Sequence, residues 1–139
     1  MSSRHFHLRM VCTYQTDKND INDLAVEVMH DGKWETLDLS IRSPGFLMYI
    51  NALFSCQHLY MRTNSAECNL ILESSTGELQ VEAGEFWNLK DINVSFKARI
   101  KSGTATESNI QYISERMTHC PVSTNLPESV NMDISVDFC

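Results

Sequence analysis

Two periodicities of apolar residues alternate along this chain, and together they predict strands as well as helices. Apolar residues recur at every second position in the segments 4–12, 24–41, 68–83, 92–100 and 130–138. This spacing is typical of strands that bury one face against a core. Asp31-Gly32 and the run Ser74–Gly77 are turn signals, so we expect the second and third segments to fold as hairpins. The return strand of the first hairpin would carry Leu37, Leu39 and Ile41, with a bulge near Thr36.

Two other segments follow the helical period. The stretch Phe46–Met61 contains no Asp, Glu, Lys or Arg and is apolar on nearly all sides, which predicts a helix buried on most faces. Ser43 can cap its amino end, and Pro44 suits the first helical position. The second helix has one apolar stripe at spacings of three and four: Ile110, Ile113, Met117 and Cys120. A threonine before this helix (Thr104 or Thr106) can cap it, and the proline after Cys120 ends it.

The order of these elements indicates the fold class. Strands, a helix, strands, a helix and a final strand are typical of an α+β protein, which we expect to be an antiparallel sheet packed on two helices. The chain of 139 residues shows no internal repeat or linker, so we expect residues 1–139 to form a single domain. One sheet cannot cover a helix that is apolar on all sides. We therefore expect a homodimer in which a second copy of the chain covers the rest of the helix.

Charge narrows the classes of partner. The net charge is −7 and the sequence pI is about 5.1, which argues against nucleic acid and anionic membranes as partners. The apolar helix is also too short and too polar in its second half to span a membrane. The first residues lack a signal-peptide core, so we expect a cytoplasmic protein. Its five cysteines, an odd number at irregular spacing, should be thiols in that compartment.

Two of the cysteines are candidates for chemistry. Cys56 lies in the middle of the first predicted helix, and Cys120 lies at the end of the second, each on an apolar stripe. If both stripes face the same core, the two sulfur atoms can meet. The alternative is that both are small buried apolar residues, as free cysteines often are. His5 and His7 share a strand face, but we expect them to face solvent and predict no metal site.

The residues around these cysteines carry a family resemblance. Cys120–Ser123, read Cys-Pro-Val-Ser, closes the second helix, and Phe54–Cys56 lies on a long apolar helix that opens with Ser43-Pro44. Both motifs, and the strand order around them, resemble the OsmC/Ohr family of osmotically inducible and organic hydroperoxide resistance proteins. The resemblance extends from about Val26 to Phe138.

The resemblance implies an OsmC-like intertwined homodimer and a thiol-dependent peroxidase that needs no cofactor. In such an enzyme Cys56 would attack an organic hydroperoxide, Cys120 would resolve the sulfenic acid into a disulfide, and a dithiol reductant would regenerate both thiols. We expect an apolar substrate pocket lined by Phe46, Tyr49, Phe54 and Met117.

Two positions differ from the family pattern. Gly45 stands where active members carry a glutamate, and no arginine clearly matches the one that holds the thiolate. Arg4 and Arg9 are the loose candidates, whereas Arg42 would lie about 20 Å from Cys56 along a continuous helix. A buried thiol without a cation has a raised pKa and is inert. The alternatives to the peroxidase are therefore a catalytically silent OsmC-like protein that binds an apolar small molecule and a structural dimer without a ligand.

Overall fold

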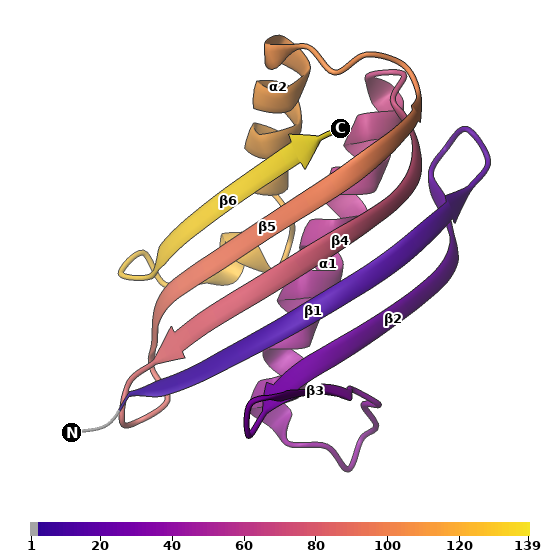
Figure 1. Ribbon diagram of the computed structural model, residues 1–139. Helices are drawn as coiled ribbons and strands as arrows, with labels where there is room; N and C mark the ends of the chain where they lie inside the picture. Colours follow the sequence, from indigo (N-terminus) through magenta and orange to yellow (C-terminus); the bar gives the residue numbers. More distant parts are fainter. Residues whose placement is uncertain (1–2) are drawn as a thin grey trace.

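The computed structural model describes residues 3–139, which form one six-stranded sheet with both helices on one of its faces (Figure 1). In chain order the elements are β1 (Arg4–Gln15), β2 (Asp20–His30), β3 (Lys33–Thr36), α1 (Gly45–Glu67), β4 (Ile71–Ala83), β5 (Leu89–Ser102), α2 (Glu107–Met117), the short 3-10 helix η1 (Ser123–Asn125) and β6 (Asn131–Phe138). The strand order across the sheet is β3-β2-β1-β4-β5-β6. The predicted α+β class is confirmed.

Alternating apolar residues on the central strands form the core between sheet and helices. In β1, in β5 and in β4 beyond its irregularity near Ser74, alternate side chains face the helices and are buried, as the pattern predicts; the set includes Leu8, Met10, Leu79, Val81, Ile92, Val94 and Phe96. Phe54 of α1 packs on Phe96, with ring centroids 5.8 Å apart. Gly77 lies beneath this aromatic pair, and any side chain there would collide with the Phe96 ring.

Three strand predictions need correction. The sheet is mixed, because β6 runs parallel to β5 while the other neighbours are antiparallel. The parallel pair follows from the crossover through α2, which returns the chain to the starting edge. The run Ser74–Gly77 makes no turn and lies inside β4. Gly77 allows the Phe96 ring to pack directly on the backbone there. β3 ends at Thr36, and Ile41 is 91% exposed beyond the sheet.

One hairpin turn and two helix caps were predicted from the sequence, and the turn and one of the caps are present. Asp31 and Gly32 both have positive φ (50° and 78°), as a tight two-residue hairpin turn requires. Ser43 does not cap α1, because its hydroxyl accepts from the Ser40 amide at 2.9 Å and the helix begins after Pro44. Thr106 does cap α2, where Asn109 completes a reciprocal capping box.

Within one chain, α1 is buried where it packs on the sheet and on α2, and its remaining face is exposed. The buried residues include Ile50, Leu53, Phe54 and Met61, whereas Tyr49 and Leu59 on the remaining face are 41% and 42% exposed. The prediction of burial on most faces therefore does not hold for a single copy of the chain. None of the helices in residues 3–139 combines the length and apolarity needed to cross a membrane.

A buried polar chain crosses the core between α1 and the sheet. Tyr14 Oη lies 2.7 Å from His58 Nε2 and 2.5 Å from Ser75 Oγ, and His58 also stacks on Phe96. Burial, helped by the positive charge of Arg62, lowers the pKa of His58 to about 4. The imidazole is therefore neutral near pH 7, and its unprotonated Nε2 can accept the Tyr14 hydroxyl proton.

This shift predicts acid sensitivity. The unfolded chain takes up a proton on His58 near pH 6.5, whereas the folded chain does so only near pH 4. The contribution of His58 is therefore fully present above pH 6.5 and falls by about 3 kcal/mol as the pH drops to 4. Urea unfolding at both pH values should show this loss. His58→Gln keeps a partner for Tyr14 but does not titrate, so an equal loss in that variant would contradict the assignment.

Candidate functional site

The two candidate cysteines meet where the carboxyl end of α2 packs on the middle of α1. Cys56 is partly buried on α1, and Cys120 is fully buried in the turn that follows α2. The Thr124 amide donates to the Cys120 carbonyl at 3.0 Å, so the turn closes directly around this residue. Both are free thiols, and each acts on the pKa of the other, so the two side chains lie close together. The fold therefore brings the two predicted cysteines to one place, while their roles stay predictions.

Cys56 is a poor acid in this setting. The pKa of its thiol is raised to about 11, chiefly by burial. The neighbouring Cys120 also raises this pKa, while the Val122 amide lowers it. Among the described residues 3–139, no cation contributes to this shift. A thiol with that pKa is ionised to only about one part in ten thousand at pH 7.

Cys120 shows the opposite behaviour. Burial alone would raise the pKa of its thiol, but hydrogen bonds to the sulfur outweigh burial, and the pKa lies below that of an ordinary cysteine. Ser123, Cys56 and Gln57 make these bonds. The Gln57 side-chain amide donates to Sγ at 3.2 Å and the Ser123 backbone amide at 3.3 Å. Each donor stabilises a thiolate more than a thiol, since the negative sulfur accepts the stronger hydrogen bond.

The four residues proposed for a substrate pocket separate into two pairs. Phe46 and Tyr49 line an open groove of about 820 Å³ at the amino end of α1, together with Trp87, Leu89 and Pro127. Phe46 packs on the Trp87 ring, 5.1 Å between centroids. Phe54 and Met117, by contrast, are fully buried in the core and do not line this groove.

The groove and the cysteines lie along the same side of α1. Tyr49 precedes Cys56 by about two helical turns on one stripe, which corresponds to about 10 Å along the axis. Pro127 and Ser129, which also line the groove, follow Cys120 in the same connection to β6. The groove therefore lies along the helix from Cys56, and neither Cys56 nor Cys120 is among the residues that line it.

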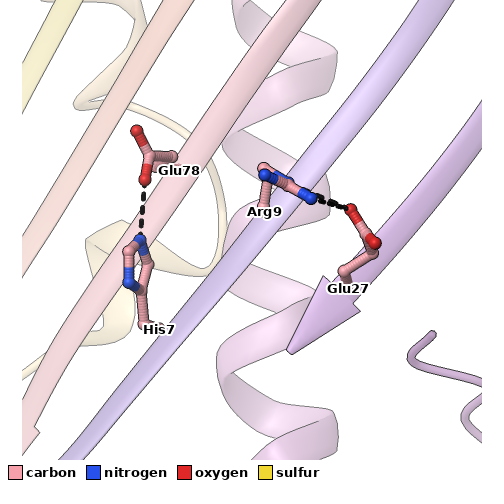
Figure 2. A network of polar contacts seen from close by, with 4 residues as sticks. All are labelled: His7, Arg9, Glu27 and Glu78. Carbon is pink, nitrogen blue, oxygen red and sulfur yellow. Dashed lines mark hydrogen bonds and ion pairs between the residues drawn. The ribbon is translucent and has the colours of Figure 1, made fainter. Parts of the chain in front are cut away.

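The arginines proposed as thiolate partners lie elsewhere. Arg9 binds Glu27 at 2.7 Å and stacks over Trp34, on the sheet face opposite the helices (Figure 2). Arg4 stacks over Trp87, 4.1 Å from its ring centroid, and donates to the Glu85 carbonyl. Neither contributes to the pKa of a cysteine in the pair.

His5 and His7 also point away from the helices. His7 Nε2 lies 2.7 Å from Glu78 Oε1 (Figure 2), and His5 Nε2 lies 3.8 Å from Glu82. In the part of the chain that the structure describes, no three His, Cys, Asp or Glu side chains are grouped to hold a metal ion.

Sequence reasoning missed Gln57 and Trp87 as parts of the site. Gln57 follows Cys56 directly, and its only signal is that it is polar within an apolar helix. Trp87 has a positive φ of 69° in a loop before β5, where no periodicity applies. Ser123 was visible as the last residue of Cys-Pro-Val-Ser, but the role of its backbone amide depends on the turn geometry.

The fold is that of OsmC-like proteins. It superposes on the OsmC-like protein from Mycoplasma pneumoniae with a TM-score of 0.56 and 11% sequence identity, over 92% of this chain and 94% of that chain. An OsmC-like hydroperoxide resistance protein from Jannaschia sp. CCS1 gives a TM-score of 0.58 and 12% identity, over 87% and 85%. No protein-family model matches the sequence, and no curated protein matches it significantly.

Proposed function

We propose that this OsmC-like chain is a thiol-dependent peroxidase that reduces organic hydroperoxides through Cys56 and Cys120. The observation that carries the proposal is the proximity of two free thiols, Cys56 on α1 and Cys120 in the turn after α2, each of which acts on the pKa of the other. The neighbour from Jannaschia is described as a hydroperoxide resistance protein, which fits the same chemistry. The cytoplasm, where thiols stay reduced, would suit such an enzyme.

Exposure favours Cys56 as the attacking residue. Its thiol is partly buried, whereas Cys120 is fully buried, so a peroxide reaches the Cys56 sulfur first. The resulting sulfenic acid would lie beside Cys120, which can displace its oxygen and form a disulfide. A dithiol reductant would then restore both thiols by exchange.

The aromatic groove suggests the class of substrate. Phe46, Tyr49 and Trp87 offer apolar surface, and each Å² of apolar substrate removed from water contributes about 25 cal/mol. An organic hydroperoxide with a bulky apolar group would therefore react faster than hydrogen peroxide.

We also propose that the outer face of α1 binds a second copy of the chain. This face carries no formal charge and includes Tyr49, Ala52, Cys56 and Leu59. An uncharged helix face of this kind stabilises a homodimer by removing apolar surface from water. The face includes Cys56, so a second copy would also lie next to the sulfur pair.

A second candidate function rests on the raised pKa of Cys56. With its pKa at about 11 and Gly45 in place of a glutamate, the chain could retain the fold and bind an apolar small molecule in the groove without reducing it. The catalytic assay below separates the two functions.

The first test is turnover. The reduced protein, supplied with cumene hydroperoxide and a dithiol such as dihydrolipoamide, should consume the hydroperoxide, and faster than it consumes hydrogen peroxide. Cys56→Ser should abolish consumption, because the attacking sulfur is removed. Cys120→Ser should carry Cys56 no further than the sulfenic acid, because no partner thiol remains to form the intrachain disulfide. Cys68→Ser, which changes a cysteine outside the pair, is the matched control and should retain full activity.

Absence of turnover in the reduced wild type would favour the binding function.

The second test is oligomeric state. Light scattering should give twice the 15.9 kDa of one chain at low micromolar concentration. Leu59→Lys places a charge on the outer face of α1 and should shift the protein toward monomer. Ile41→Lys is the control, because Ile41 is 91% exposed and lies outside that face. A folded wild-type monomer would contradict the proposed interface.

A further inference from the structure

The sulfur pair has no cation to stabilise a thiolate, yet neutral hydrogen-bond donors gather on one of the two sulfurs. Cys120 Sγ accepts from Gln57 and from the Ser123 amide, in addition to its bond with Cys56. Among the described residues, the groups besides burial that act on the pKa of Cys56 are the Val122 amide, which lowers it, and Cys120, which raises it. The site is therefore asymmetric, and Cys120 is better prepared to carry a negative charge.

The orientation of Gln57 is fixed by its second partner. Nε2 lies 2.8 Å from the Met117 carbonyl oxygen, which can only accept a hydrogen bond. The amide nitrogen must therefore face this oxygen, and its other hydrogen is directed at Cys120 Sγ at 3.2 Å. The Gln57 side chain is fully buried and its Oε1 has no partner. Both hydrogens of the Gln57 amide group are therefore used, one on the Met117 carbonyl and one on Cys120 Sγ, while Oε1 accepts none.

The Ser123 amide is held in place independently. The single hydroxyl proton of Ser123 is shared between the carbonyls of Thr118 and Cys120, whose oxygens lie 3.1 and 3.0 Å from Oγ. These bonds fix the turn that places the Ser123 amide 3.3 Å from Cys120 Sγ. Two donors from different elements, α1 and the first residue of η1, thus converge on one sulfur atom.

We propose that Gln57 is a positioning residue which, with the Ser123 amide, holds one negative charge on Cys120, and that this thiolate is the base that activates Cys56. The assignment deepens the peroxidase proposal and rests on it for the catalytic steps. In this proposal the neutral donors stabilise the thiolate in place of a cation, and the two cysteines share one proton. Gln57 itself touches neither peroxide nor a reacting oxygen.

The reaction balances with one proton on the pair. Cys56 attacks the terminal oxygen of ROOH; an S–O bond forms, the O–O bond breaks, and the Cys56 proton moves to the Cys120 thiolate. The leaving alkoxide then takes that proton and departs as ROH, which restores the Cys120 thiolate. This thiolate attacks the sulfur of the Cys56 sulfenic acid, so the S–S bond forms and hydroxide leaves. The two sulfurs together lose two electrons, and the peroxide gains them.

The test is a thiolate absorbance titration of the reduced full-length protein, which needs no peroxide. The wild type should show one thiol that ionises below the ordinary cysteine range. Cys56→Ser should retain this step, because a serine hydroxyl can still donate to Cys120, and Cys120→Ser should remove it. Gln57→Met removes one donor to the thiolate and should raise the pKa of this step by about one unit.

Gln57→Glu should raise the pKa of the same ionisation further, because a carboxylate repels the thiolate. Gln111→Met, an exposed position on α2, is the matched control and should leave the step unchanged.

A second readout separates positioning from a purely structural role. In single-turnover oxidation by cumene hydroperoxide, the pH midpoint for Gln57→Met should move upward by the same amount as the titration. A rate that falls equally at all pH values, with no movement of the midpoint, would overturn the proposal. So would a low titration step that survives Cys120→Ser. If the Gln57 variants do not fold, the two cysteine variants still decide which sulfur ionises first. A normal titration pattern without turnover would contradict the peroxidase and leave the charge assignment standing.

Discussion

The contact between Gln57 and the Met117 carbonyl joins the two helices at the point where their cysteines meet. It links the middle of α1 to the last residue of α2 at 2.8 Å, inside a region that excludes water. A hydrogen bond of this kind contributes about 1 kcal/mol. The same Met117 carbonyl accepts from the Cys120 amide at 3.4 Å, so it is a shared anchor for α1 and for the turn that carries Cys120. The spacing of Cys56 and Cys120 depends on this contact, because it sets the position of the turn that carries Cys120.

The sheet provides the fixed surface on which this contact is built. Phe54 of α1 packs on Phe96 above Gly77, so close approach of α1 to the sheet depends on a glycine in the middle of β4. Asn19, fully buried at the β1–β2 turn, donates to the carbonyls of Arg62 and Leu70 and accepts from the Leu72 amide. These bonds hold the end of α1 against the start of β4. The helix that carries Cys56 is therefore held against the sheet at its middle and near its carboxyl end.

The sequence predicted the periodic parts of this structure and missed those that depend on tertiary contacts. The strand faces of β1 and β5, the stripe of α2 and the positive-φ turn at Asp31-Gly32 all follow from local patterns. The run Ser74–Gly77 has the polar residues and glycine of a turn. Its glycine is instead required inside β4 by the rings packed above it, which local sequence does not show. The parallel β6 could not be predicted from alternation, which is the same for both strand directions.

For the candidate site, the sequence indicated the two cysteines but not the distribution of charge between them. The spacing of apolar residues placed Cys56 and Cys120 on helix faces that could meet. The pKa directions depend on Gln57 and the Ser123 amide, whose contacts arise from side-chain packing and turn geometry. The dimer and the roles of the two cysteines stay predictions.

Peptide mapping under non-reducing conditions tests the central claim most directly, since that claim is that these two sulfurs form one reactive pair. After treatment of the reduced protein with one equivalent of cumene hydroperoxide, the account predicts a single intrachain disulfide between Cys56 and Cys120, with Cys12, Cys68 and Cys139 still reduced. A disulfide that joins Cys56 to any other cysteine, or an unmodified Cys56, would contradict it.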